Sequence, residues 1–492
     1  MLNSSAPNGY FAGDLILYGT LEKASPARVL FCNRPTFAAA SRNLTPTDKI
    51  RALLSLFGDG LRAQFQWTCN CDYRQELTHT TAPPRPLPRT RTSAACTERF
   101  ERYWEKMHRR ELRREQLILF ISAPLAGYAP LAATRGSLAD DYAKLLAQLR
   151  TRFDEITNSL RALFGGDTTV SPMDDLAHFT YFSKFLSPAL ADGFDINFSE
   201  RFAPQQTIQE NCWCSDGVNI GTGFYMDGRH HALFTFKRWP SRTYPGIILR
   251  LTTLPFLDYQ ITVNLDPLPT KTEVDKEEKA IERLRGEYKD SERHSLLVAI
   301  GKKERKVESL SSGFIHPFNV TYILRVWDET EPGLSAKCAA IRNAVTNLNG
   351  AQYNECALPS TAKKLFFASW PGWTNSPYRH RSLYAEDTYL ADLLPFSATF
   401  TGLLDGAEAI YDGAQQGNLV GLRTFIGNPP TPQHAVLLGA FSGKSVHMCD
   451  LLSRPPPTII TRSSSKRACP TESLPRQWVS AQSYSTPTAT SR

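Results

Sequence analysis

The stretch that most limits the possible folds is residues 434–452, HAVLLGAFSGKSVHMCDLL. HAVLLG has the apolar run of a buried strand, and SVHMCDLL has the apolar spacing of a helix. Between them, a glycine-containing loop ends in Gly-Lys-Ser. A buried strand that turns through such a loop into a helix is typical of α/β proteins that bind phosphate groups. The stretch therefore predicts a phosphate-binding loop inside an α/β domain.

The loop has the residue types that bind phosphate, at a spacing one residue shorter than usual. Glycines let backbone N–H groups curl around the phosphates, the lysine reaches the β and γ oxygens, and the hydroxyl binds Mg²⁺. Gly439, Gly443, Lys444 and Ser445 occupy these positions, but three residues separate the two glycines where the motif has four. Since one residue spans roughly 3.3–3.6 Å, we expect weakened ATP binding. The alternative is a chance turn between a strand and a helix.

ATP hydrolysis needs a further strand that ends in an acidic residue, which holds Mg²⁺ and orients the attacking water. The segments ITVNLD, ending at Asp266, and YILRVWD, ending at Asp328, have that pattern. Both precede the loop, and no comparable segment follows Ser445. We therefore interpret them as ordinary strands with a polar exit. The sequence identifies no catalytic residue and no metal site formed by protein ligands.

Length and composition place the chain among large globular proteins. Its 492 residues are 41% hydrophobic, enough for about two to four domains. No stretch reaches the roughly 18–20 apolar residues of a membrane-spanning helix, and the first residues lack the basic-then-apolar order of a signal peptide. Ten scattered cysteines favour a reducing cytosol over a disulfide framework. The net charge of +8 is small for this length, so polyanion binding would require a local patch.

Residues 1–270 predict an α+β region with mixed sheets and helices, in which helical apolar spacing alternates with β-branched and aromatic runs. Segment 78–96 is rich in proline and reads as a loop or linker. Helices are expected at 46–60, 97–116, 136–163 and 174–190, and strands at 14–22, 61–73, 117–122, 223–240 and 244–269.

Beyond residue 270 the composition changes along the chain. Residues 271–315 are dense in mixed charge, which suggests a connector of long exposed helices between two packed regions, with a break at Gly286. Residues 316–405 predict a small β-α-β subdomain, with a strand at 317–330, a helix at 333–348 and a strand at 363–372. Residues 406–453 would then begin the domain that contains the phosphate-binding loop.

The segment 454–492 is dominated by Ser, Thr, Pro and Arg and cannot build a core. Two accounts of it remain open. It is either a natural disordered tail or the product of a reading-frame slip that replaced the rest of a domain. We favour the slip, because a helix that has just begun after a phosphate-binding loop is left without the sheet it should cover.

With these elements in order, the chain resembles the large cytoplasmic ATPases of type IV secretion and conjugative DNA transfer. More specifically, it resembles the TraC-type ATPases of integrative conjugative elements, a class of mobile genetic element. Four segments carry the resemblance: RAQFQWTCNCDYRQEL, RYWEKMHRRELRREQLILFIS, FKRWPSRTYPGIILRLTTLPFLDY and QHAVLLGAFSGKSVHMCDLLS.

The resemblance implies an N-terminal α+β region that docks on the membrane secretion apparatus, followed by a RecA-like P-loop motor domain. It implies ATP hydrolysis that powers channel or pilus assembly and DNA transfer, with ATP and Mg²⁺ bound at Gly439, Gly443, Lys444 and Ser445. It also implies inner-membrane secretion components as partners, a homo-oligomer, and a location at the cytoplasmic face of the inner membrane. This chain departs from the family in its shortened loop and in lacking the remainder of the motor domain after its first helix.

Two other classes of function stay open. The chain could be a non-catalytic docking or assembly subunit of the secretion apparatus. It could also be a nucleic-acid-binding module that uses the basic segment 98–115, where Tyr103 and Trp104 lie among arginines. The glutamates in this segment fall at i,i+4 spacing to arginines, however, which is typical of a solvated helix face.

Smaller candidates have structural interpretations beside functional ones. The pairs Cys69/Cys71 and Cys212/Cys214 have one intervening residue, which on a strand would put both thiols on one face. Zinc sites more often have two to four intervening residues, so buried side chains are favoured over a zinc site. His230 and His231 are adjacent on an expected strand, so they should face opposite sides and not share an ion. The segment KRWPSRTYPG, residues 237–246, is suited to contact with a partner, although its tryptophan could simply pack over a strand edge.

Overall fold

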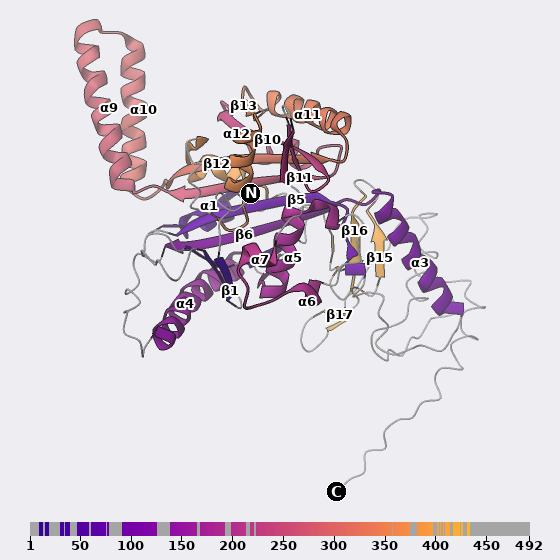
Figure 1. Cartoon of the computed structure of the whole chain (residues 1–492). Helices are drawn as coiled ribbons and strands as arrows, with labels where there is room; N and C mark the ends of the chain where they lie inside the picture. The colour runs from indigo at the N-terminus through magenta and orange to yellow at the C-terminus, as the bar shows by residue number, and fades with distance from the viewer. Residues whose placement is uncertain are drawn as a thin grey trace, which may run out of the picture. The chain divides into compact units, whose positions relative to one another are not determined.

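The computed structural model describes most of the chain up to residue 432 (Figure 1). The described residues are 9–12, 15–18, 30–33, 35–39, 47–58, 61–74, 76–77, 91–124, 138–164, 168–191, 198–212, 217–220, 223–356, 358–373, 381–396, 401–402, 404, 407, 409–413, 417–423, 425–426 and 431–432. The chain divides into two compact units that are discontinuous in sequence. Unit 1 comprises residues 1–72, 110–401 and 415–418, and unit 2 comprises residues 73–109, 402–414 and 419–492.

Unit 1 is built on a large antiparallel sheet. Its central strands run in the order β3-β6-β5-β11-β12-β10-β9-β8, and each neighbouring pair is antiparallel. The strands of this sheet are β1 (Gly9–Ala12), β2 (Leu15–Tyr18), β3 (Leu30–Asn33), β4 (Pro35–Ala39), β5 (Arg62–Asn70), β6 (Arg114–Pro124), β7 (Thr168–Pro172), β8 (Gly217–Ile220), β9 (Gly223–Met226), β10 (Arg229–Arg238), β11 (Tyr259–Pro267), β12 (Pro317–Asp328), β13 (Gln352–Glu355) and β14 (Leu383–Glu386).

Helices of unit 1 connect these strands. They are α1 (Thr47–Ser55), α4 (Leu138–Phe164), α5 (Asp175–Leu186), η3 (Pro188–Ala191), α6 (Phe198–Arg201), α7 (Ile208–Asn211), α8 (Leu249–Thr252), α9 (Thr270–Ser291), α10 (His294–Ser311), α11 (Glu331–Thr346), α12 (Pro359–Ala368) and α13 (Asp387–Leu393). No helix among the described residues is long and apolar enough to cross a membrane. The fold of unit 1 is thus mixed α/β with an antiparallel sheet.

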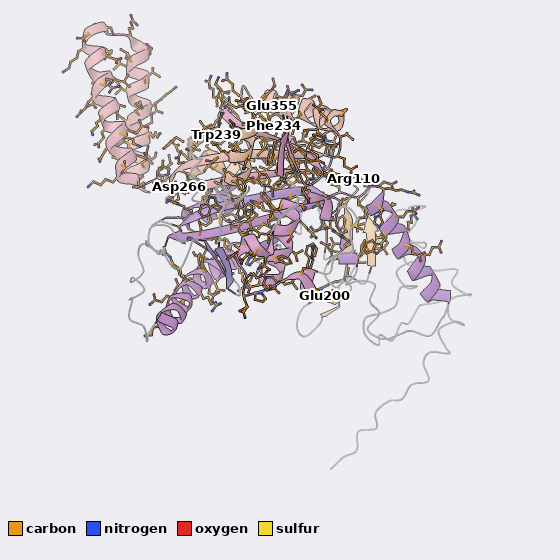
Figure 2. The ribbon with its side chains drawn as sticks, in the orientation of Figure 1. Arg110, Glu200, Phe234, Trp239, Asp266 and Glu355 are labelled. Atoms are coloured by element: carbon orange, nitrogen blue, oxygen red, sulfur yellow. The ribbon has the colours of Figure 1, made fainter. Side chains whose placement is uncertain are left out.

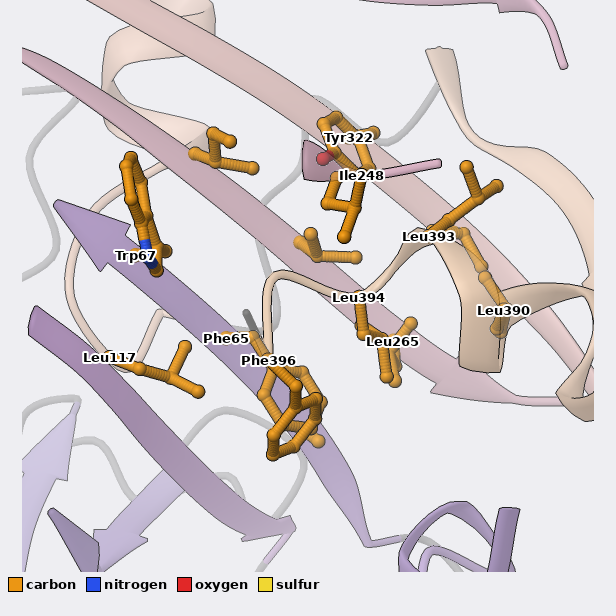
Figure 3. Packing of buried hydrophobic residues seen from close by; sticks show 14 of the residues in the cluster. Phe65, Trp67, Leu117, Ile248, Leu265, Tyr322, Leu390, Leu393, Leu394 and Phe396 are labelled. Carbon is orange, nitrogen blue, oxygen red and sulfur yellow. The ribbon is translucent and has the colours of Figure 1, made fainter. Parts of the chain in front are cut away.

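One face of the sheet carries the larger apolar core. Phe65 and Trp67 on β5 pack with Leu265 on β11 and Tyr322 on β12, beneath residues of α1, α4, α11 and α13. Figure 3 shows part of this cluster, in which Phe396 reaches the Phe65 ring at a centroid distance of 5.5 Å. The alternation of β5 and β11 places their large apolar side chains on this face, which fixes the register between the two strands.

The opposite face of the same strands is also buried but carries amide side chains. Gln64 and Gln66 on β5 are both fully buried, and Gln260 on β11 is nearly so. We expected a half-buried strand at 61–73, because an apolar/polar alternation usually marks a face in water. The prediction of a strand is confirmed, but its polar face is covered by α5 and the end of α12. Tyr181 of α5 donates to Gln66, and the Ser369 and Trp370 carbonyls just after α12 accept from the glutamines.

Helices α9 and α10 form an antiparallel hairpin inserted between β11 and β12, which are adjacent strands of one sheet. The two helices lie side by side and extend away from the sheet (Figure 1). The predicted long exposed helices are confirmed, but two details were wrong. The hairpin does not connect two packed regions, and α9 continues through Gly286, the turn coming instead at Glu292 with φ of 43°.

Several other boundaries differ from the expectations. Residues 363–372 were expected to be a strand, but most of them belong to α12, which begins at Pro359 in the first helical turn. A β-α-β order was expected in this region. The observed elements are β12, α11 and the short β13, and both strands belong to the main sheet. Residues 247–252 form a turn and α8 where a strand was expected. The predicted helices and strands around α1, α4, α5, β10, β12 and α11 are confirmed.

Among its described residues, unit 2 contains the long helix α3 and two small hairpins. Its elements are α3 (Arg91–His108), β15 (Ala409–Asp412), β16 (Leu419–Leu422), β17 (Phe425–Ile426) and β18 (Thr431–Pro432). The hydroxyl of Tyr103 on α3 donates to the Ile410 carbonyl at 2.8 Å, and Lys106 pairs with Asp412. Residues 91–96 belong to α3, although we expected them in a loop, and the helix ends before 109–116.

Candidate functional site

The predicted phosphate-binding residues lie outside the described part of the chain. Gly439, Gly443, Lys444 and Ser445 all fall within residues 433–492, which the structure does not describe. The strand, loop and helix expected there stay predictions, as does the tail at 454–492.

The two strand ends that resemble a magnesium-binding carboxylate serve structural contacts. Asp266, near the end of β11, pairs with Nε of Arg62 at 2.8 Å. Asp328, at the end of β12, accepts hydrogen bonds from the main chain and hydroxyl of Thr330 and pairs with Lys337 at 2.9 Å. Burial opposes ionisation of Asp328, but these bonds outweigh it and lower its pKa. Both carboxylates therefore bond to residues of unit 1, as expected for ordinary strands with a polar exit.

The cysteine and histidine pairs do not form a cluster. Cys69 lies in β5 and is buried, as is Cys71 just after the strand. Cys212 follows α7 and is not on a strand, and Cys214 lies outside the described residues. His231 is buried while His230 packs on Tyr225. Among the described residues, no group of three or more His, Cys, Asp and Glu side chains could hold a metal ion.

The basic segment 98–115 satisfies many of its charges internally. Arg109 pairs with Glu105 one turn away, and Lys106 pairs with Asp412 of β15. Arg113 lies outside the helix and is buried, donating to the carbonyls of Leu254 and Thr252. These contacts favour the structural interpretation of the segment over a nucleic-acid surface.

The clearest unpaired charge in unit 1 lies at residues 237–250, which we call the cationic loop. The cationic loop runs from the last two residues of β10 to the second residue of α8 and carries Lys237, Arg238, Arg242 and Arg250, all exposed. None of the four forms an ion pair with any residue that the structure describes. Residues 228–257 contain no Asp or Glu. The positive charge of the loop is therefore not neutralised by its own segment.

Trp239 of this loop packs into the fold, whereas Tyr244 does not. The Trp239 indole N–H donates to the Tyr384 carbonyl at 2.9 Å, and its ring contacts those of Phe236 and Tyr322 (Figure 2 labels Trp239). The expectation that this tryptophan packs over a strand edge is thus confirmed. Tyr244 is 42% exposed and Leu249 is 39% exposed, so the apolar contact surface of the loop comes from these two side chains.

Hydrogen bonds fix the cationic loop at both ends. Near its start, the main-chain N–H and hydroxyl of Ser241 both donate to the Asn349 carbonyl at 2.9 Å, and the Asn349 side chain donates to the Arg242 carbonyl at 3.0 Å. Asn349 has a φ of 44°, the left-handed conformation that asparagine tolerates well. Just after the loop, the Arg113 guanidinium donates to the carbonyls of Thr252 and Leu254 and so holds the end of α8. The loop is therefore preorganised.

A second unusual group, Arg325, is a buried cation on the amide face of the sheet. It is 1% exposed, and its guanidinium lies 4.7 Å from the Phe185 ring centroid, 4.6 Å from that of Phe366 and 5.0 Å from that of Trp327. Its Nη1 donates to the Phe185 carbonyl at 2.9 Å, and no carboxylate among the described residues pairs with it. Burial lowers the pKa of Arg325. Since the rings enclose it, this cation ties α5 and α12 to β12.

His231 lies beside Arg325 and shares its environment. The Arg325 Nε lies 3.4 Å from His231 Nδ1. Burial, reinforced by the charge of Arg325, lowers the pKa of His231 well below its usual value. His231 is therefore neutral at pH 7 and can accept from the arginine. Sequence reasoning missed both roles, although a single arginine inside the apolar run YILRVWD was visible as a signal.

Comparison with known proteins adds no assignment to this geometry. No protein-family model matches the chain, and no curated protein matches it.

Proposed function

We propose that the chain is a conjugative-transfer ATPase of a type IV secretion system, with ATP hydrolysis energising channel or pilus assembly and DNA transfer. The observation that carries this proposal is the sequence of residues 434–452, in which an apolar run typical of a buried strand is followed by a glycine-containing loop, Lys444, Ser445 and the apolar spacing of a helix. In this proposal the segment begins a RecA-like domain. The backbone of Gly439 to Gly443 would surround the phosphates, Lys444 would contact the β and γ oxygens, and Ser445 would bind Mg²⁺.

The described region supports the proposal in one respect. The mixed α/β fold of residues before the loop agrees with the α+β docking region that the resemblance implies. Asp266 and Asp328 are engaged in ion pairs of unit 1, so the carboxylate that orients water must come from elsewhere.

Nucleotide binding tests the proposal directly. We expect the full chain to bind Mg²⁺-ATP weakly, and Lys444→Ala to reduce binding by at least about tenfold, because the lysine contacts two phosphates. Lys302→Ala is the matched control, since Lys302 is an exposed lysine on α10 and its loss removes the same charge. Isothermal titration or a fluorescent ATP analogue would measure both variants. Equal binding by wild type and Lys444→Ala would contradict the proposal.

Lengthening the loop provides a sharper test of its geometry. Insertion of one glycine after Ser442 restores four residues between Gly439 and Gly443. If the segment descends from a phosphate-binding loop, the insertion should tighten ATP binding, and Lys444→Ala should abolish the gain. If the segment is a chance turn, the insertion should leave the ATP affinity unchanged both in the wild type and in Lys444→Ala.

A second candidate function is a non-catalytic docking or assembly subunit, which the α9/α10 hairpin favours. Near the turn of the hairpin, Leu297 and Val298 are each 44% exposed, an apolar pair at the end of an arm whose flanks are charged. In this function the chain would associate with inner-membrane secretion components without binding nucleotide. Leu297→Glu combined with Val298→Glu should then abolish co-purification with those components, while Leu249→Glu on the cationic loop should not.

A further inference from the structure

We propose that the cationic loop, residues 237–250, binds the anionic phospholipid headgroups of a bilayer surface. Four exposed cations without an ion pair among the described residues, in a run of chain without acidic residues, give this segment a net positive charge that is complementary to an anionic surface. An anionic bilayer supplies many headgroups at once, so it can neutralise all four cations without a precisely shaped partner. This inference is independent of nucleotide binding and does not rest on the proposed function.

The exposed apolar side chains favour a bilayer over a nucleic acid. Leu249 is 39% exposed and is followed directly by Arg250, while Tyr244 is 42% exposed and lies two residues after Arg242. Aromatic and aliphatic side chains next to cations are typical of segments that insert at the headgroup boundary. A nucleic-acid backbone would use the tyrosine and the cations, but it offers no apolar region for the leucine.

Neighbouring acidic groups do not cancel this charge. Glu355 on β13 forms two hydrogen bonds of 2.8 Å with Arg342 of α11. Asp392 lies near the loop, where burial raises its pKa and the side chain of Thr243 donates to it. The first carboxylate is already paired and the second is partly buried and bonded to Thr243, and neither forms an ion pair with a cation of the loop.

The rigidity of the loop adds to its suitability as a binding surface. Its main chain is bonded to Asn349 near the start, and Arg113 holds the main chain just after it. Binding therefore does not require the segment to be ordered first, a step that would cost conformational entropy.

Vesicle sedimentation tests the proposal with the full chain and no nucleotide. The probes are phosphatidylcholine vesicles with about 30% phosphatidylglycerol and vesicles of phosphatidylcholine alone. We expect binding to the anionic vesicles only, weakened by 0.5 M salt. Arg242→Ala with Arg250→Ala should reduce the partition coefficient about 25-fold, because each cation near an anionic surface contributes about fivefold. Leu249→Ala should reduce it further.

Controls separate this surface from general charge and from the nucleotide site. Arg293→Ala with Lys302→Ala removes the same two charges from exposed positions of the α9/α10 hairpin and should change vesicle binding by less than about threefold. Lys444→Ala should leave vesicle binding unchanged. The far-ultraviolet circular dichroism of each variant should match the wild type, since all the altered side chains in unit 1 are exposed.

Three results would overturn the proposal. The first is equal binding to charged and neutral vesicles. The second is an equal loss in the loop and hairpin variants. The third is displacement of the chain from anionic vesicles by a 30-base-pair duplex DNA, together with loss of DNA binding in Arg242→Ala with Arg250→Ala and retention of DNA binding in Leu249→Ala. That result would assign the loop to nucleic acid instead.

Discussion

The amide face of the sheet predicts a large and local effect at Gln64. This side chain is fully buried, and its Nε2 donates to Asn264 Oδ1 at 2.8 Å and to the Trp370 carbonyl at 3.0 Å. Its Oε1 accepts from the Gly372 N–H at 2.7 Å. Gln64→Met keeps the length and approximate volume of the side chain but removes these three hydrogen bonds. It also removes the bond that Gln66 Nε2 donates to Gln64 Oε1 at 3.1 Å, which adds little to the cost because the same nitrogen still donates to the Ser369 carbonyl. The turn that follows α12 thereby loses its attachment to β5.

The magnitude follows from these three bonds. A hydrogen bond between buried groups contributes about 0.5–1.5 kcal/mol net, and the cost of losing it lies toward the upper value when the remaining partner stays buried. Three such losses give about 2–4 kcal/mol. The Trp370 carbonyl still accepts from the Trp373 N–H at 3.0 Å, which keeps the total below the sum of three full desolvation penalties.

Hydrogen exchange and urea unfolding with pulse proteolysis would measure this loss. We expect amides of residues 359–373 to exchange faster in Gln64→Met, and the free energy of unfolding of unit 1 to fall by about 2–4 kcal/mol. Gln352→Met is the matched control, because Gln352 is exposed on β13 and its replacement should cost less than about 0.5 kcal/mol. A loss below about 1 kcal/mol at Gln64 would refute the role assigned to the buried amides.

Three further predictions concern titration, the hairpin and thiol reactivity. The pKa of His231 is lower in the fold than in the unfolded chain, so the unfolded state binds more protons as the pH falls below about 6.5. The free energy of unfolding should therefore decrease there by up to about 1.4 kcal/mol per pH unit. Urea unfolding at pH 7.5 and 5.0 should show a smaller difference in this free energy between the two pH values for His231→Phe than for the wild type. Lys306 contacts Glu277 at 2.8 Å and lies 4.1 Å from the Tyr384 ring centroid. Lys306→Met should therefore speed hydrogen exchange in α10 and lower its local stability by about 1 kcal/mol, a loss that shrinks in high salt. Unchanged exchange would contradict the role of Lys306 as an anchor. Burial raises the pKa of Cys212 to about 12, so its alkylation by iodoacetamide at pH 7.5 should be about a thousandfold slower in the native chain than in urea, as peptide mass spectrometry would measure.

The sequence predicted the long periodic elements because their signals do not depend on the rest of the fold. Helix α4 and strand β12 follow the expected spacing over many residues, and Thr330, which caps α11, is a typical N-cap residue. Residues 363–372 were misassigned because LFFASW is an apolar aromatic run that is compatible with a buried strand or a buried helix. The segment is a helix, which Pro359 begins and which buries Phe366 completely in the smaller apolar core.

The two polar features of the sheet could not be predicted from local pattern. Alternation in RAQFQW identifies which residues share a face, but not whether water or α12 covers the glutamines. Arg325 is enclosed by rings from α5, α12 and β12, elements that lie far apart in sequence. The cationic loop was identified in part. Its charge was visible in the sequence, whereas the burial of Trp239 and the exposure of Leu249 depended on the tertiary structure.

The division into units decides how variants of the basic helix should be interpreted. Helix α3 belongs to the same compact unit as residues 419–492, which include the predicted phosphate-binding loop. Within that unit, Tyr103 and Lys106 of α3 bond to β15 at Ile410 and Asp412. Loss of these contacts would destabilise unit 2 whether or not α3 contacts nucleotide or DNA. A binding defect caused by exposed α3 residues such as Arg102 would therefore argue for a nucleic-acid surface, whereas one caused by Tyr103→Phe would indicate only a weakened unit.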